Sequence, residues 1–186
     1  MIQIRKNTFE TNSSSTHAFA YYKETKPKID FEKYEATIEV LDKDYPLIYP
    51  IHTFESIEDK LRYFYTIYVQ EWNPEEESWY RSYAVKNFMD KIFEIFPKVT
   101  FVPFKGDRWN DMIYMEDSDC VFDTDCHWKD RIHDLLDNED KLKKFFTDGV
   151  IYFGDRDAGN PYTFWSPWDD MWEDNPNIEK ITYATG

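Results

Sequence analysis

Glycine, cysteine and long apolar runs are all scarce in this chain of 186 residues. Its five glycines argue against a glycine-loop architecture and against a low-complexity chain. Its two cysteines, Cys120 and Cys126, do not make a disulfide framework. No run of about 20 apolar residues is present, so we expect no membrane-spanning helix. No stretch near residue 1 joins a charged region to an apolar run, so we expect no signal peptide and a cytoplasmic protein.

Basic residues are also few. The chain has 22 Lys and Arg against 37 Asp and Glu, which gives a net charge of −15 and a pI near 4.6. Nucleic-acid binding needs basic side chains that neutralise phosphate, so we expect no direct nucleic-acid partner. An acidic surface attracts cations and basic protein surfaces and speeds their association. We therefore expect a basic protein partner and no membrane, with ordinary solubility as the simpler explanation of the charge.

Aromatic residues, by contrast, are abundant: the chain has 15 Phe, 14 Tyr and 7 Trp. Each buried aromatic side chain removes roughly 150–250 Å² from water, so a substantial core can form. Disordered acidic segments are poor in aromatics, so this composition is typical of a folded protein. The length and composition predict a single globular domain over residues 1–186.

Alternating and short apolar patterns predict the strands. The N-terminal residues 1–5 and residues 17–22 form the first two, and the serine-rich stretch between them is expected to turn so that they pair. Residues 150–153 are expected to form a central strand. The other predicted strands cover residues 35–41, 98–104 and 178–184, with short ones at 112–115 and 120–122.

Helix signals are clearer than strand signals. Ser56 and Asp59 form a variant of the capping box before an apolar pattern of helical spacing. Asn73 and Pro74, followed by three glutamates, predict a second helix that ends at Pro97. Further helices are expected over residues 128–136 and from Asn138 through residue 146. Strands and helices do not alternate regularly, so the predicted class is α+β, with a mixed, largely antiparallel sheet and about four helices packed on it.

The serine-rich stretch "FETNSSSTHAF" (residues 9–19) is the first candidate site. Hydroxyls and successive backbone N–H groups in a turn can form a concavity that binds anions. The predicted ligand-binding residues are Asn12, Ser13, Ser14, Ser15 and His17. If the segment is extended, alternate residues project to one side, which also allows nucleophilic catalysis with His17 as the base. The structural alternative is that Asn and Ser side chains satisfy local backbone groups in a turn.

This stretch also carries a family resemblance. "RKNTFETNSSSTHAF" (residues 5–19) resembles the N-terminal signature R-x-x-x-FETNSSS-x-H of a family of mostly uncharacterised proteins from phages and their low-GC bacterial hosts. "FFTDGVIYFGDRD" (residues 145–157) resembles the glycine-bearing strand and acidic turn of the C-terminal part of such proteins. The resemblance implies a phage or mobile-element setting and a small cytoplasmic protein. It implies no established reaction, so no catalytic role follows from it.

The "GDRD" turn (residues 154–157) is the second candidate. Carboxylates at the end of a strand can bind a hard cation or act as a general base, which makes Asp155 and Asp157 weak catalytic candidates beside His17. If this turn meets the serine segment, carboxylates, hydroxyls and the imidazole would share one pocket. The structural alternative is a solvated turn in which one carboxylate pairs with Arg156 or another base.

Cysteine and histidine also cluster, but their spacing is poor for a metal. The cluster consists of Cys120, Cys126, His127 and His133. Zinc sites usually show closer cysteine pairs, and adjacent ligands strain a shared tetrahedron. No EF-hand pattern is present. We therefore expect no metal and no cofactor, and a free thiol in or near the core.

Acidic residues are dense in two stretches, with tryptophans among or beside them. Residues 107–125 carry seven acids and one base, Arg108, and residues 155–179 carry seven acids and one base, Arg156. Carboxylates set among aromatics can imitate a nucleic-acid backbone and occupy the groove of a basic protein. The predicted partner-binding residues are Asp117, Asp119, Asp123, Asp125, Asp169, Asp170, Glu173 and Asp174.

Two functions from different classes follow. The first is a phage or mobile-element accessory protein that binds a basic host protein, such as a nuclease or another defence component, through its acidic, Trp-rich face. The second is a small-ligand or nucleotide-binding domain or hydrolase that uses the segment from Asn12 to Ser15 and His17 with Asp155 or Asp157. The residues alone leave open whether the chain is an enzyme.

Overall fold

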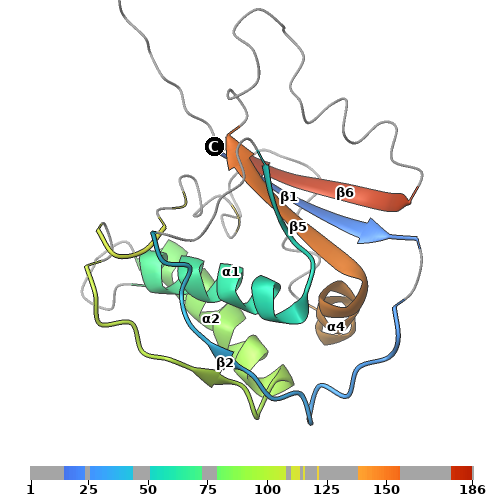
Figure 1. Cartoon of the computed structure of the whole chain (residues 1–186), viewed down its shortest axis with the longest axis horizontal. Helices are drawn as coiled ribbons and strands as arrows, with labels where there is room; N and C mark the ends of the chain where they lie inside the picture. Colours follow the sequence, from blue (N-terminus) through green and yellow to red (C-terminus); the bar gives the residue numbers. More distant parts are fainter. Residues whose placement is uncertain are drawn as a thin grey trace, which may run out of the picture.

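The structure is a computed structural model that describes residues 15–23, 26–43, 51–72, 79–107, 110–113, 115, 121, 138–155 and 177–185. These residues form an α+β fold, as the sequence predicts. A four-stranded sheet packs against a layer of helices, and a two-stranded ribbon lies on the other side of the helices (Figure 1). No helix in these ranges is both long and apolar enough to cross a membrane.

The main sheet contains β1 (Ser15–Tyr22), β3 (Ile51–Phe54), β5 (Gly149–Asp155) and β6 (Ile178–Thr185). Its order is β3-β5-β1-β6, and each neighbouring pair is antiparallel. The strands predicted at residues 17–22, 150–153 and 178–184 are confirmed, and β5 lies between β3 and β1 as a central strand should. The sequence analysis assigned no strand to the residues of β3.

The expected pairing of residues 1–5 with residues 17–22 is wrong. β5 pairs with β1 from Ser15 to Tyr21, and β6 pairs with β1 from Thr16 to Tyr22. A strand has two hydrogen-bonding edges, and both edges of β1 are therefore occupied. The N-terminal residues themselves lie outside the described residues.

The described part of the chain contains three helices, α1 (Ile57–Glu71), α2 (Trp79–Ile95) and α4 (Glu139–Asp148). The caps of α1 and α4 are as predicted, because Ser56 Oγ accepts the Asp59 N–H at 3.0 Å and Asn138 Oδ1 accepts the Lys141 N–H at 3.1 Å. α2 ends just before Pro97, also as predicted. Its predicted start at residues 73–74 and the predicted helix over residues 128–136 lie outside the described residues.

The two-stranded ribbon is shorter than the strands predicted there. β2 (Thr37–Ile38) and β4 (Thr100–Phe101) pair in parallel for two residues each, within the predicted ranges 35–41 and 98–104. Pro103 cannot donate a ladder hydrogen bond, which limits the extension of β4. Of the predicted strand at 112–115, only an isolated bridge between Asp42 and Met112 is seen among the described residues. Of the one at 120–122, only Val121 is described, and it is buried.

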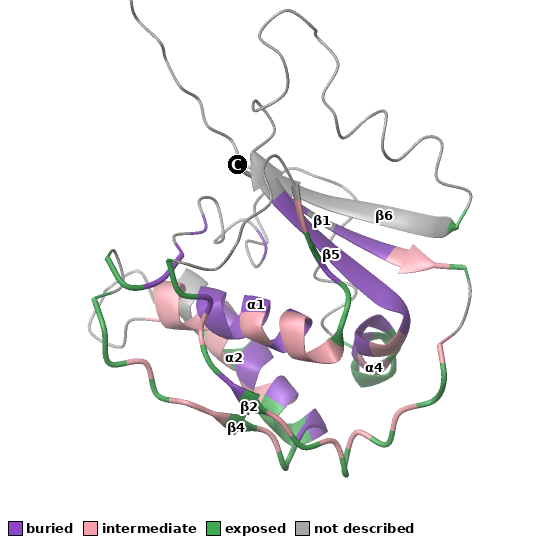
Figure 2. Cartoon of the chain, viewed as in Figure 1, coloured by how far each residue is buried: buried purple, intermediate pink, exposed green. Residues whose placement is uncertain are grey.

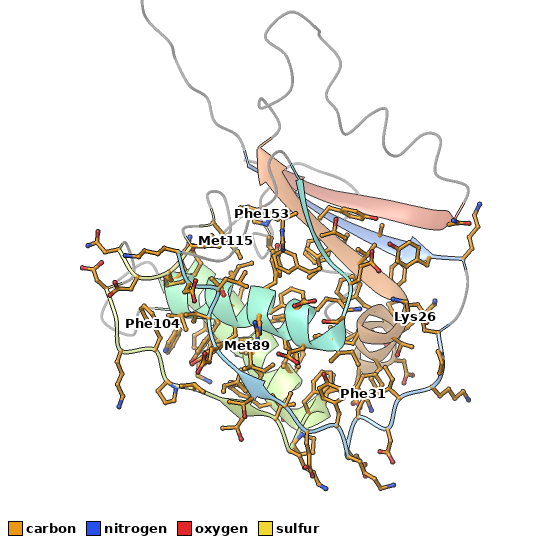
Figure 3. All side chains as sticks on the ribbon, viewed as in Figure 1. Lys26, Phe31, Met89, Phe104, Met115 and Phe153 are labelled. Carbon is orange, nitrogen blue, oxygen red and sulfur yellow. The ribbon has the colours of Figure 1, made fainter. Side chains whose placement is uncertain are left out.

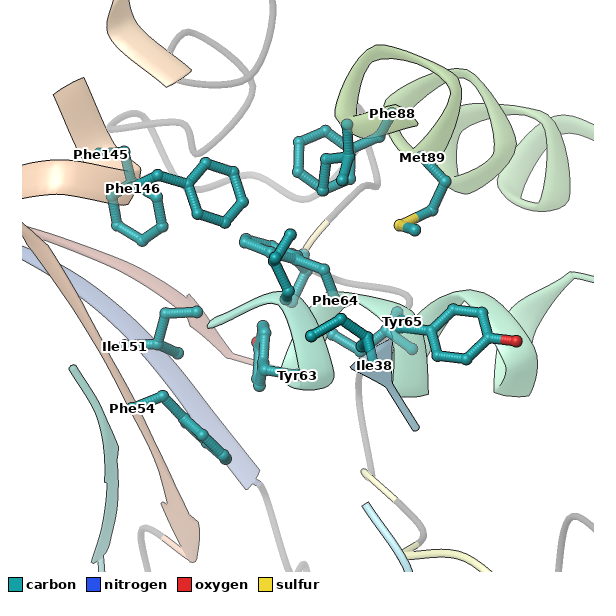
Figure 4. Packing of buried hydrophobic residues seen from close by; sticks show 14 of the residues in the cluster. Ile38, Phe54, Tyr63, Phe64, Tyr65, Phe88, Met89, Phe145, Phe146 and Ile151 are labelled. Carbon is teal, nitrogen blue, oxygen red and sulfur yellow. The ribbon is translucent and has the colours of Figure 1, made fainter. Parts of the chain in front are cut away.

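α1 lies in the middle of these layers, with seven of its 15 residues buried and the others intermediate in exposure (Figure 2). Toward the sheet and α4, the rings of Tyr63 and Phe64 pack against Phe54 and the two phenylalanines of α4 (Figure 4). On its other side, the ring of Tyr65 lies 5.1 Å from the ring of Phe101 in β4 of the ribbon. Most of these ring pairs meet edge to face, the arrangement that aromatic quadrupoles favour. The core therefore forms around α1.

α4 runs directly into β5 through Gly149, whose N–H donates to the carbonyl oxygen of Phe145. A Cβ atom on Gly149 would lie 2.4 Å from Phe145 Cδ2 and 2.5 Å from the Phe145 carbonyl oxygen. The Phe145 carbonyl is part of the backbone, so it can move away from an added Cβ atom only if the end of α4 shifts. The turn from helix to strand therefore requires glycine at this position.

We expect Gly149→Ala to lower the free energy of unfolding by about 1–3 kcal/mol, because overpacking forces the helix end to shift. Urea denaturation followed by circular dichroism would measure it. Gly106→Ala is the matched control, since the atoms nearest its added methyl belong to the Asp111 and Phe104 side chains. Equal losses of unfolding free energy for the two variants would contradict the conclusion that the α4–β5 turn requires glycine.

Candidate functional site

Ser15 of the serine segment and Asp155 of the "GDRD" turn lie opposite each other at one end of the sheet. The β1–β5 register pairs Ser15 with Asp155, Thr16 with Gly154 and His17 with Phe153. The last serine of one candidate site therefore lies beside the first carboxylate of the other at the level of the backbone. Asn12, Ser13, Ser14 and Asp157 lie outside the described residues.

His17 is completely buried, inside the layer between the sheet and α1. Its Nδ1 lies 2.6 Å from the hydroxyl oxygen of Tyr63, and its ring lies 5.0 Å from the ring of Phe153 (the position of Phe153 is labelled in Figure 3). Either the hydroxyl donates to an unprotonated Nδ1, or a protonated Nδ1 donates to the hydroxyl oxygen. The contact joins β1 to α1. A ligand from solvent would reach this imidazole only if the surrounding side chains moved.

Tyr63 has no exposed surface, and burial raises the pKa of its hydroxyl well above the usual value. The shift favours the protonated hydroxyl, which can donate to or accept from the imidazole. In this arrangement, the pair orients the His17 ring and fixes α1 to the centre of the sheet.

A second histidine, which the sequence analysis did not select, lies in the same row of the sheet. His52 of β3 pairs with Phe153, which pairs with His17 on the other side. Directly opposed residues in an antiparallel sheet share a face, so two imidazoles flank one phenyl ring on the side that faces the helices. His52 is half-buried; burial lowers its pKa, and the charge of Asp59 opposes that decrease. The signal in the sequence is the composition of "IHTF", since β-branched Ile51 and Thr53 and aromatic Phe54 favour a short strand.

Lys60 is the most unusual residue in the described part of the chain, because it is a lysine with no exposed surface. Its Nζ donates to the carbonyl oxygens of Phe145 (3.1 Å), Phe146 (2.6 Å) and Gly149 (2.7 Å). These carbonyls belong to the last turn of α4 and the first residue of β5. A recognisable signal was available: Lys60 stands at an apolar position of the helical pattern that includes Ile57, Leu61 and Phe64.

Charged groups from several elements surround this contact. Asp148 is nearly buried, and its carboxylate accepts the Lys26 backbone N–H and the Lys144 Nζ, both at 3.0 Å (Lys26 is labelled beside α4 in Figure 3). Burial lowers the pKa of Lys60 to about 7, and the charge of Lys26 adds to the decrease. The charges of Asp148, Glu55 and Asp59 act in the opposite direction.

The remaining predicted site residues lie outside the described residues. They comprise the eight partner-binding acids, Asp117, Asp119, Asp123, Asp125, Asp169, Asp170, Glu173 and Asp174, and the alternative metal cluster of Cys120, Cys126, His127 and His133. Among the residues that are described, no three His, Cys, Asp or Glu side chains are grouped so that they could hold a metal ion.

Comparison with known proteins gave no match to a protein-family model, to a curated protein or to a solved structure.

Tyr63→Phe should lower the free energy of unfolding by about 1–3 kcal/mol, because a buried imidazole nitrogen loses its hydroxyl partner. Tyr65→Phe is the matched control: its hydroxyl donates to the part-buried carbonyl of Val102 at 2.7 Å, which water can partly replace. Urea denaturation of both variants would compare the two losses. A smaller loss for Tyr63→Phe than for Tyr65→Phe would show that the His17 contact does not hold β1 to α1.

Proposed function

We propose that this protein acts by stoichiometric binding of a basic protein through the carboxylates of two acidic, Trp-rich segments, residues 107–137 and 155–186. The resemblance of residues 5–19 to phage and bacterial proteins supports a partner in a bacterial host, such as a nuclease or another nucleic-acid-binding defence component, and a phage or mobile-element origin of the protein itself. The distribution of charge along the chain is the observation that supports this proposal.

The acidic excess is not spread evenly. Residues 107–137 carry ten acids and three bases, and residues 155–186 carry seven acids and two bases. Together these segments account for −12 of the net charge of −15. The rest of the chain carries 20 acids and 17 bases and is close to neutral.

The near-neutral part of the chain pairs many of its own charges. On the helices, Glu58 pairs with Arg62, Lys86 with Asp90, and Glu139 with Lys143, each four residues apart. Such pairs leave little net field around the helical layer. The two acidic segments supply nearly all of the field that a cationic partner would meet, and complementary fields raise association rates by orders of magnitude.

The surface most complementary in charge to these acidic segments is a basic groove that binds nucleic acid. Carboxylates substitute for phosphates, and tryptophans offer flat rings with a polar edge, as nucleobases do. The five tryptophans of these segments are Trp109, Trp128, Trp165, Trp168 and Trp172. An acidic protein of this kind competes with nucleic acid and does not bind it.

The test is competition for DNA. Purified bacterial nucleases and other proteins with basic DNA-binding grooves would each be bound to a fluorescent duplex, and the acidic protein would be titrated in at low salt. We expect stoichiometric displacement of the duplex from at least one panel member, read as a loss of fluorescence anisotropy. The displacement should weaken as salt is raised, because the attraction is screened.

Two charge-reversal variants of equal net charge make the test specific. The first changes Asp117, Asp119, Asp169 and Asp170 to Lys and should abolish displacement. The second changes four exposed acids of the near-neutral part to Lys, namely Glu32, Glu39, Glu94 and Asp140, and should keep most of it. Equal behaviour of the two variants would show that net charge alone, and not the two segments, causes the effect. Failure to displace DNA from every panel member would count against the proposal.

A second candidate function, binding of a small anionic ligand, is favoured by the backbone pairing of Ser15 with Asp155. That register brings the serine segment and the acidic turn to one end of the sheet. Thermal unfolding with a panel of nucleotides, phosphate and divalent metals would test it. We expect one ligand to raise the midpoint by several degrees and Ser14→Ala to remove that shift. The absence of a shift with every compound would rule out this second candidate.

A further inference from the structure

β6 forms one outer edge of the main sheet. It is the last strand in the order β3-β5-β1-β6, and it pairs with β1 along its length (Figure 1). Successive backbone N–H and C=O groups of a strand point alternately to its two edges. Within the described part of the chain, no strand pairs with the other edge of β6. The backbone groups on that edge are therefore placed to bond a further strand.

The two outer strands of the sheet differ in how open they are to another strand. β3 has four residues and directly follows Pro50, and short length and proline are two ways in which proteins protect an edge. β6 has eight residues and no proline or glycine, and five of the eight are β-branched or aromatic. Its one acid and one base, Glu179 and Lys180, cancel in charge. β6 is therefore the edge that suits strand addition.

Acidic residues stand at both ends of β6. Glu173 and Asp174 precede its first residue by five and four positions, so chain length alone keeps them within roughly 18 Å of it. At the other end, β5 closes with Asp155, one pair beyond the pairing of Thr16 with Thr185. A strand added to β6 would therefore have acidic residues near both of its ends.

A second copy of this chain is a poor occupant of that edge. Pairing of β6 with itself would bring together two chains of net charge −15, each with its acidic segment 155–186 at the contact. A basic segment brings the opposite charge to the same acids. The main-chain bonds of an added strand require no particular sequence, so charge decides between the two occupants.

We propose that the outer edge of β6 is the docking site for an extended, Lys- or Arg-rich segment of the partner, which pairs with β6 as a fifth strand of the sheet. This inference rests on the proposed function, because it gives the basic partner a place to bind. Backbone hydrogen bonds hold the added strand, and the acids at the ends of β6 select its charge.

The probe for this site is an octapeptide of alternating lysine and threonine, acetylated and amidated at its ends. Amide hydrogen exchange of the full chain would be followed by NMR with and without the peptide. Every second N–H of β6 should exchange more slowly, by about tenfold when the free peptide is at about ten times its Kd. The N–H groups of β3 should not change. Unchanged exchange in β6, or slower exchange in β3 instead, would overturn the proposal.

Two further peptides separate strand pairing from charge. The same sequence with every backbone nitrogen methylated keeps its charge but has no N–H donors. Alternating glutamate and threonine keeps the donors but reverses the charge. Neither peptide should slow exchange in β6. Slowing by the methylated peptide equal to that by the parent would show that no strand is added, and equal slowing by the glutamate peptide would show that charge selects nothing; either result sinks the idea.

Neutralisation of the acids before β6 tests the selection by charge in the protein itself. Glu173→Gln combined with Asp174→Asn should raise the Kd of the lysine–threonine peptide severalfold at low salt. The matched control, Glu39→Gln combined with Glu94→Gln, removes two exposed acids that follow β2 and belong to α2, and it should raise the Kd less. Equal increases in the two double variants would contradict a role for the acids beside β6.

The docking edge and the proposed function can fail separately. Displacement of DNA by the protein, without slower exchange in β6, would remove the docking edge and keep the proposed function. Slower exchange in β6, without displacement of DNA from any protein, would keep the docking edge and remove the competition with nucleic acid.

Discussion

The burial of α1 is the constraint on which the rest of the structure depends. The helix lies between the sheet and the β2–β4 ribbon. Seven of its residues are therefore buried, namely Lys60, Leu61 and residues 63–67. Polar side chains on the buried part of such a helix lie away from water, and each one needs a partner inside the protein. The partners are found in every layer that touches the helix. Tyr63 binds β1, Tyr65 binds the chain just after β4, Lys60 binds the α4–β5 junction, and Thr66 accepts the Leu41 N–H at 2.8 Å.

Each polar contact of α1 therefore fixes one neighbouring element in one register. Apolar packing alone is tolerant of small shifts, since a phenyl ring can slide along another at little cost. A hydroxyl or ammonium group that donates to one particular carbonyl does not tolerate such shifts, because a broken hydrogen bond leaves a buried polar group unsatisfied. The same reasoning applies to the C-terminal end of the helix. There, Gln70 Oε1 accepts the Met115 N–H at 3.0 Å, and Gln70 Nε2 donates to the Met115 carbonyl oxygen at 2.7 Å. The polar residues of α1 thus specify the arrangement that its aromatic residues stabilise.

Sequence reasoning succeeded where the cause is local and failed where it is not. The caps Ser56 and Asn138 lie within three residues of the N–H groups they accept, so both helix starts were predictable. The pairing of residues 1–5 with β1 was wrong because the partners of β1 are at least 128 residues away in the chain. The buried role of Lys60 depends on the end of α4, 85 residues distant, and only its place in the apolar pattern hinted at it. The meeting of Ser15 and Asp155 was proposed from chemistry, and the backbone register places them together, but their side chains and the eight acids were not described.

The distinction between local and distant interactions also applies to the acidic segments. The buried side chains of Lys60, Tyr63 and Thr66 bind partners inside the protein, and surface charges of the helices pair within single turns. The seventeen acids of residues 107–137 and 155–186 lie apart from these groups in the sequence. Clustered like charges repel one another and lower the stability of a compact chain. A sequence that keeps seventeen acids in two segments, beside a remainder that is nearly neutral, carries this cost. Under the proposed function, a cationic partner relieves the repulsion when its basic side chains bind between the acids of the segments.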